Sequence, residues 1–120
     1  MTRYFLKVMP DYYSSGLWDQ NEEGTMTELR NHIEASGEVI ALENDLHKWN
    51  QKYDETISWG KDRPNPDFDW DGFHKEGIML AKRLKKLMGH NGKVIYFKEA
   101  DHISSQTSEE ILIHDEEITD

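Results

Sequence analysis

Residues 69–89 read DWDGFHKEGIMLAKRLKKLMG, and this stretch predicts an amphipathic helix from about 70 to 88. Its apolar positions recur at steps of three and four residues, which places them along one face of a helix. They are Phe73, Gly77, Leu80, Ala81, Leu84 and Leu87. Asp69 is placed to cap the first turn, and Gly89 follows the last turn, where glycine commonly ends a helix.

A second amphipathic helix is expected upstream, from about 38 to 56. Its apolar stripe has the same spacing and faces a core. The stripe consists of Val39, Leu42, Leu46, Trp49 and Tyr53. Ser36 is placed as its N-cap, and Glu38 favours the positive end of the helix dipole. Residues 58–68, which contain two prolines, are expected to form the loop between the helices.

Short strands are expected on either side of the helices. Residues 3–9 (RYFLKVM) alternate so that Tyr4, Leu6 and Val8 share one face, and residues 93–98 (KVIYFK) form a second strand. Residues 10–27 are turn-rich and aromatic, with Gly16 and Gly24 as breakers of regular structure. Residues 28–34 are ambiguous, with a short helical turn as one interpretation.

These elements predict an α+β fold in which a small β-sheet packs against two amphipathic helices. The length of 120 residues indicates one domain. We assign that domain to residues 1–100 and an acidic C-terminal tail to residues 101–120. Within the tail, residues 110–114 are a candidate short edge strand.

The composition excludes several classes of protein. Acidic residues outnumber basic ones 24 to 14, for a formal charge of −10, so neither direct nucleic-acid binding nor attraction to an anionic membrane is expected. Cysteine is absent, which excludes disulfides, thiolate zinc sites and cysteine nucleophiles. No apolar run approaches the roughly 18 residues of a membrane-spanning helix, and no signal core is recognised. We therefore expect a soluble, cytoplasmic protein.

The charge is distributed unevenly along the chain. Residues 21–60 contain nine acids and three bases, for a net charge of −6, whereas residues 61–100 contain nine bases and six acids, for a net charge of +3. The last twenty residues contain seven acids and no base. The acidity is thus concentrated in an early-middle block and in the tail.

No motif supports catalysis or a bound cofactor. Asp67, Asp69 and Asp71, followed by Gly72, match the first half of a calcium loop, but the twelfth position is Ile78 instead of a bidentate glutamate. Helix capping by Asp69 explains the pattern better. The six histidines show no metal-binding spacing, and we interpret them as solvent-facing. We predict no metal, no cofactor and no enzyme, while a metal-dependent enzyme using these aspartates and histidines stays as a third hypothesis.

The candidate functional residues lie in an aromatic and acidic segment near the N-terminus. Tyrosine and tryptophan are common anchors of protein interfaces, and neighbouring carboxylates steer a basic partner toward them. The predicted partner-binding residues are Asp11, Tyr12, Tyr13, Trp18, Asp19, Glu22 and Glu23. In the alternative interpretation, Leu17 and Trp18 are buried in the core and the acids are merely solvated.

Three motifs occur in a recognisable order. A YxSSGLWD-type turn spans residues 12–19, an L-x-x-W-x-x-x-Y pattern starts at Leu46, and F-D-W-x-x-F-x-x-E-G covers residues 68–77, ahead of a closing VIYF strand. Over residues 3–98 the chain resembles small acidic bacterial immunity proteins of toxin–immunity systems, including contact-dependent growth inhibition. The tail lies outside this resemblance.

The resemblance implies an immunity protein whose partner is a cognate toxin domain. Toxins that act on nucleic acid present a basic groove, which an acidic inhibitor would reach quickly and block. We therefore expect the target to be a nuclease, such as an RNase acting on tRNA. The immunity protein would neutralise it by covering its basic active site. The alternative is a non-toxin adaptor or regulatory protein-binding domain that uses the same surface.

Overall fold

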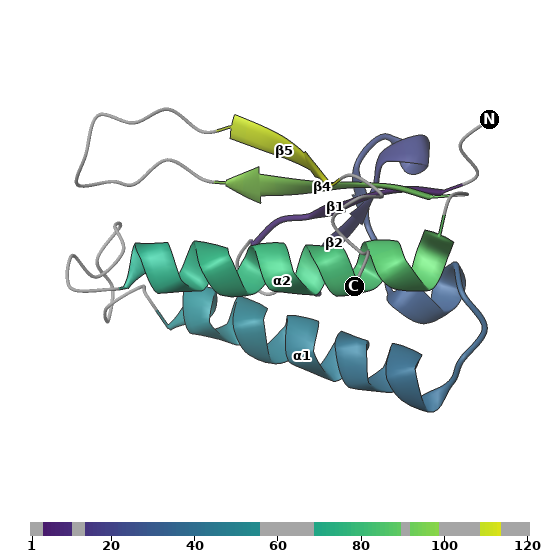
Figure 1. Cartoon of the computed structure of the whole chain (residues 1–120), viewed down its shortest axis with the longest axis horizontal. Helices are drawn as coiled ribbons and strands as arrows, with labels where there is room; N and C mark the ends of the chain where they lie inside the picture. The colour runs from purple at the N-terminus through teal and green to yellow at the C-terminus, as the bar shows by residue number, and fades with distance from the viewer. Residues whose placement is uncertain (1–3, 11–13, 56–68, 90–91, 99–108, 114–120) are drawn as a thin grey trace.

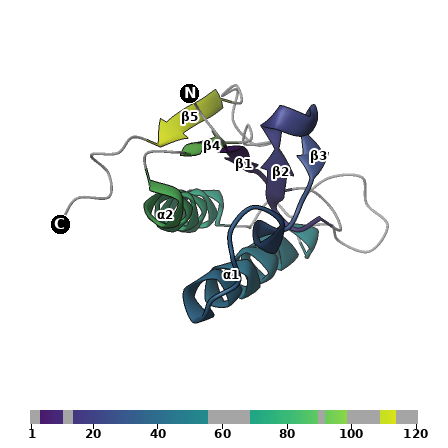
Figure 2. The same ribbon diagram turned by 90° about the vertical axis from the view of Figure 1, so that its right-hand side faces the viewer.

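A computed structural model describes residues 4–10, 14–55, 69–89, 92–98 and 109–113 (Figure 1). They form a five-stranded mixed sheet with two helices packed on one of its faces, and Figure 2 shows both helices on the same side of the sheet. The expected α+β fold class is confirmed. The loop expected at residues 58–68 lies outside the described residues.

The sheet has the strand order β3-β2-β1-β4-β5. The strands are β1 (Tyr4–Val8), β2 (Leu17–Asp19), β3 (Thr25–Met26), β4 (Gly92–Lys98) and β5 (Glu109–Ile113). β1 and β4 are parallel, and the other neighbouring pairs are antiparallel. A parallel pair requires a long crossover connection, and here both helices lie within the connection from β1 to β4.

The two long helices start where the sequence predicts. In α1 (Gly37–Asp54), the Ser36 hydroxyl accepts a hydrogen bond from the Val39 N–H at 3.2 Å. In α2 (Trp70–Met88), the Asp69 carboxylate accepts one from the Gly72 N–H at 3.0 Å. Both predicted caps are confirmed, since each satisfies an N–H that the first helical turn leaves without a partner.

The core lies between the helices and the sheet, and aromatic rings fill its centre. Trp49 stacks on Phe73 with ring centroids 4.7 Å apart, and its Nε1–H donates to the Phe73 carbonyl at 3.0 Å. Tyr96 reaches the same cluster from β4, with its ring centroid 6.0 Å from that of Trp49. α2 packs close to these rings at Gly77, which has no side chain to separate it from them.

The turn-rich segment at residues 10–27 contains two short strands that the sequence did not indicate. β2 pairs with β1 through Val8 and Leu17, which are both buried, and β3 pairs with β2. Two short 3-10 helices follow β2 and β3, η1 (Gln20–Glu22) and η2 (Leu29–Asn31), and η2 lies in the segment left ambiguous above. Strands of three and two residues are too short to show an alternating pattern, so only their pairing defines them.

The interpretation of the histidines as solvent-facing is wrong at two positions. His74 is only 5% exposed, and its Nδ1 lies 2.7 Å from the Tyr96 hydroxyl. His32 is half-buried, with its Nε2 3.0 Å from the Thr27 hydroxyl. One ring nitrogen of each histidine lies within hydrogen-bonding distance of a hydroxyl, that of Tyr96 for His74 and that of Thr27 for His32, which makes burial tolerable. His90, His102 and His114 lie outside the described residues.

Candidate protein-binding surface

The aromatic and acidic segment forms a short hairpin that we call the acidic hairpin, residues 17–26. β2 and β3 pair through Trp18 with Met26 and Asp19 with Thr25, and η1 joins them. The Asp19 carboxylate accepts a hydrogen bond from the Asn21 N–H at 2.9 Å, and its carbonyl accepts one from the Gly24 N–H at 2.9 Å. The hairpin is therefore a hydrogen-bonded projection with a defined shape.

Trp18 lies on the side of the sheet that faces away from the helices. Its neighbours in the strand register are Lys7 on β1 and Met26 on β3, and it is half-buried among them. Its Nε1–H donates to the Met9 carbonyl at 3.0 Å, which fixes the ring. Leu17 points the other way and belongs to the core, so the two residues have separate roles. A fixed aromatic ring at the surface can contact a partner at small entropic cost.

Asp19 lies on the opposite side of the sheet from Trp18. Consecutive residues of a strand point to opposite faces, and the partner of Asp19 in the register is the buried Leu6. Its Oδ2 lies 3.8 Å from His32 Nε2, and its side chain is mostly covered. The Asp19 carboxylate therefore holds η1 and faces inward, and the structure does not bring it together with Trp18.

Glu22 and Glu23 are exposed where η1 ends. Glu23 adopts the left-handed backbone conformation (φ 58°) and is followed by Gly24 (φ 76°), which turns the chain back into β3. Both views show η1 on the side of the sheet opposite the helices (Figures 1 and 2). The two carboxylates thus lie at the rim of the surface that contains Trp18.

Two further residues belong to this surface, although the sequence did not indicate them. Met26 is 54% exposed beside Trp18, and Lys7 is the cross-strand neighbour on the other side. Only the strand register places these two residues beside Trp18, and the register can be derived only once residues 17–19 and 25–26 are known to be strands. Asp11, Tyr12 and Tyr13 lie outside the described residues.

The residues matching the calcium motif have structural roles where the structure describes them. Asp69 caps α2, and Asp71 lies 3.0 Å from Lys75 one turn along, a contact whose hydrogen bond raises the pKa of Lys75. Across the described ranges, no three histidine or acidic side chains gather as metal ligands would. No helix within those ranges is long and apolar enough to cross a bilayer.

The opposite side of the molecule carries a shallow groove between the two helices. Two ion pairs cross it, Lys52 with Glu76 and Arg83 with Asp45, each at 2.7 Å. Met79 on α2 is 65% exposed in this groove. Because the ion pairs satisfy charges of both signs, the groove resembles a solvated helix surface more than a ligand site.

The fold and this surface define a small α+β protein with an aromatic ring and exposed carboxylates on the side of its sheet that the helices leave open. A family model described as "Serratia CdiI immunity protein-like" matches residues 5–99, and the chain belongs to this family of contact-dependent growth inhibition immunity proteins. No curated protein matches the sequence at a significant level. The match spans β1 to β4 and does not include β5.

Family membership carries a functional consequence. It implies that the protein binds the cognate CdiA toxin domain and neutralises a contact-dependent growth inhibition toxin. Proteins of this kind are typically inhibitors without enzymatic activity. The relevant site is therefore an interface, and the acidic hairpin is a candidate part of it.

Proposed function

We propose that the toxin neutralised by this protein is a nuclease and that the protein covers its basic active site in the cytoplasm. The observation that carries this proposal is the pair of exposed carboxylates, Glu22 and Glu23, which project beside Trp18 from a chain of formal charge −10. Enzymes that hold a phosphate backbone present basic side chains to it. An acidic surface with an aromatic anchor complements such a groove and would exclude the substrate.

The residues of the hairpin have different roles in this proposal. Trp18 supplies a fixed apolar contact, and Glu22 and Glu23 supply charge. Asp19 contributes indirectly, since its carboxylate shapes η1 through the Asn21 N–H. The proposed contacts extend to Asp11, Tyr12 and Tyr13, which directly precede the described part of this segment.

The experiment is a cleavage assay with the purified cognate CdiA toxin domain. We expect the domain to degrade RNA, with transfer RNA as the narrower proposed target, and we expect cleavage to stop when this protein is added in equal amount. DNA and bulk RNA are tested in parallel, so that the assay distinguishes a DNase, a general RNase and a nuclease specific for transfer RNA. A toxin domain that leaves all nucleic acids intact would contradict the proposal.

A second measurement tests whether the active site itself is covered. A catalytically inactive toxin domain is loaded with a fluorescent oligonucleotide, and this protein is titrated into the complex while anisotropy is recorded. Covering the active site predicts that the oligonucleotide is displaced at a stoichiometry of one to one. A ternary complex that keeps the oligonucleotide bound would show inhibition from a distant site.

A further inference from the structure

The sheet has one side that the helices do not cover (Figure 2). The strand registers align one residue from each of the five strands in a single row on this side. From edge to edge, the row consists of Met26, Trp18, Lys7, Ile95 and Leu112. Phe5 and Lys93 flank the row on one side, and Phe97 and Glu110 flank it on the other. We call these nine residues the open face.

The open face is mainly apolar, and its apolar surface is most exposed at the two edges. Met26 is 54% exposed on β3 and Leu112 is 41% exposed on β5, whereas Ile95 in the middle is buried. Phe5, Phe97 and Trp18 are half-buried between them. The exposed side chains at the two edges and the half-buried rings between them give this side of the sheet apolar surface that a partner could cover.

Two lysines cover the phenylalanine rings of the open face. Lys93 Nζ lies 4.5 Å from the centroid of Phe5, and Lys7 Nζ lies 5.4 Å from that of Phe97. Lys7 also forms an ion pair with Glu110 at 3.1 Å. The Lys7 side chain is only 16% exposed, whereas Lys93 is exposed, so Lys93 is the more accessible of the two cations.

The charge of the open face is opposite in sign to that of the whole molecule. Two lysines and one glutamate give it a formal charge of +1, although the chain carries −10. Glu22 and Glu23 stand at its rim on η1. A matching surface therefore needs a carboxylate opposite Lys93 and cations opposite Glu22 and Glu23, an arrangement that fixes the orientation of a partner.

We propose that the open face docks on the cognate toxin domain, against an apolar patch that offers a carboxylate to Lys93 and basic side chains to Glu22 and Glu23. Charge favours this occupant over a second copy of the chain, since a pair would bring two molecules of formal charge −10 together. The inference rests on the toxin binding in the proposed function and is independent of whether the toxin is a nuclease.

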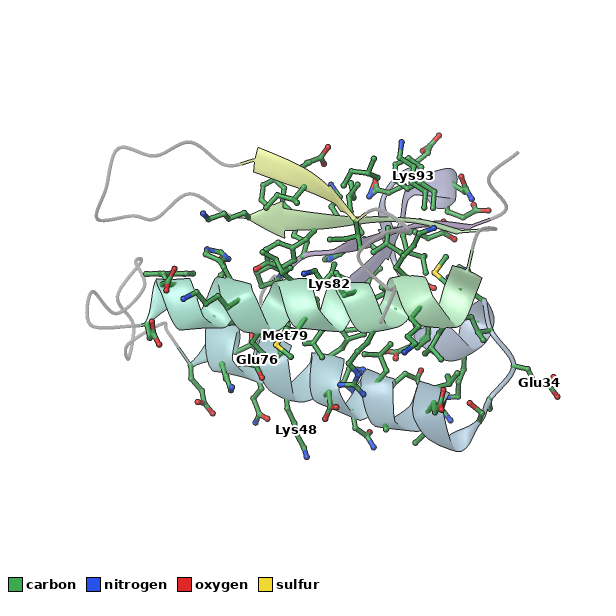
Figure 3. The ribbon with its side chains drawn as sticks, in the orientation of Figure 1. Glu34, Lys48, Glu76, Met79, Lys82 and Lys93 are labelled. Atoms are coloured by element: carbon green, nitrogen blue, oxygen red, sulfur yellow. The ribbon has the colours of Figure 1, made fainter. Side chains whose placement is uncertain are left out.

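The test measures the affinity of the full chain for the cognate CdiA toxin domain by titration calorimetry. Lys93→Glu and Met26→Ser change the open face, while Lys48→Glu and Met79→Ser make the same changes on the helices. Figure 3 shows Lys93 at the sheet, and Lys48 and Met79 on the helix side. We expect each open-face variant to weaken binding about tenfold or more and each helix variant to change it less than about twofold.

Two results would overturn the proposal. One is an unchanged affinity for the open-face variants together with a loss in the helix variants, which would place the toxin on the inter-helix groove. The other is a parent protein that sediments as a dimer and that Met26→Ser converts to a monomer. Thermal melts verify that each variant is folded, and because the assay records binding and not cleavage, a toxin that is no nuclease leaves this test valid.

Discussion

At the scale of single residues, Gly77 leaves no room for a larger side chain between α2 and two buried aromatic rings. A Cβ atom there would lie 2.4 Å from Tyr96 Cε1 and 2.7 Å from Trp49 Cζ2, and both rings are fully buried. We expect Gly77→Ala to lower the free energy of unfolding by about 1–3 kcal/mol, because rigid rings must shift to admit the methyl group. Urea denaturation followed by tryptophan fluorescence measures this change.

Gly37→Ala is the matched control, since nothing lies within 4 Å of the added atom in the first turn of α1. Alanine is the better helix former, so the control should leave stability unchanged or raise it by up to about 1 kcal/mol. Equal losses for the two variants would contradict this account, because no ring lies near the atom added at Gly37.

Glu43 is a buried carboxylate that depends on one arginine. Its side chain is 4% exposed. Its Oε1 lies 2.8 Å from Arg30 Nε, and its Oε2 accepts a hydrogen bond from the backbone N–H of Arg30 at 3.3 Å. Arg30→Ala removes the cation and leaves the carboxylate buried, which we expect to cost about 1–3 kcal/mol of stability. Arg83→Ala breaks an exposed ion pair with Asp45 and should cost less than about 1 kcal/mol in the same denaturation assay. A larger loss at Arg83 would contradict this account.

The structural role of a residue could be predicted where it depends on neighbours in the sequence, and could not where it depends on distant residues. The caps Ser36 and Asp69 could be predicted because a cap bonds within three residues of itself. The burial of His74 could not, because the hydroxyl that accommodates it belongs to Tyr96, 22 residues further along the chain. Gly77 fits the apolar stripe in the sequence, but its need to be glycine follows only from the packing of the two rings.

At the scale of elements, long amphipathic segments were predictable and short strands were not. α1 and α2 each contain several turns of periodic sequence, whereas β2 and β3 exist only through their pairing with neighbours. The candidate site at residues 11–23 stays a prediction, and strand alternation places Trp18 and Asp19 on opposite sides of the sheet. The register then brings Lys7 to Trp18 from another part of the chain.

β5 is the element whose contribution can be tested by truncation. It pairs with β4 over five residues and places Ile113 in the core, although it lies outside the matched family region. A chain ending at residue 108 loses this strand, and we expect its stability to fall by about 3 kcal/mol or more relative to a chain ending at Ile113. Thermal and urea denaturation of the two chains give the difference. Equal stability would mean that β5 adds nothing to the core.

At the scale of the whole molecule, the position of the charged residues decides how a partner approaches more than the net charge does. The acidic hairpin lies at one end, where η1 projects, and the opposite end holds the last turn of α1 and the first turn of α2 (Figure 1). The helix surface between these ends carries paired charges of both signs. A basic partner would therefore approach the hairpin end first, since the exposed carboxylates there attract it over roughly one Debye length.

This asymmetry predicts how the rate of association depends on salt. Replacing Glu22 and Glu23 with serine changes the formal charge from −10 to −8, and replacing Glu55 and Asp71, which are exposed at the opposite end, makes the same change. We expect the hairpin variant to bind the cognate toxin domain about threefold to tenfold more slowly at low salt, with a flatter salt dependence. The control should behave nearly as the parent in stopped-flow measurements across about 0.05–0.5 M salt. If both variants slow association equally, net charge alone steers the encounter, and the hairpin has no special part in it.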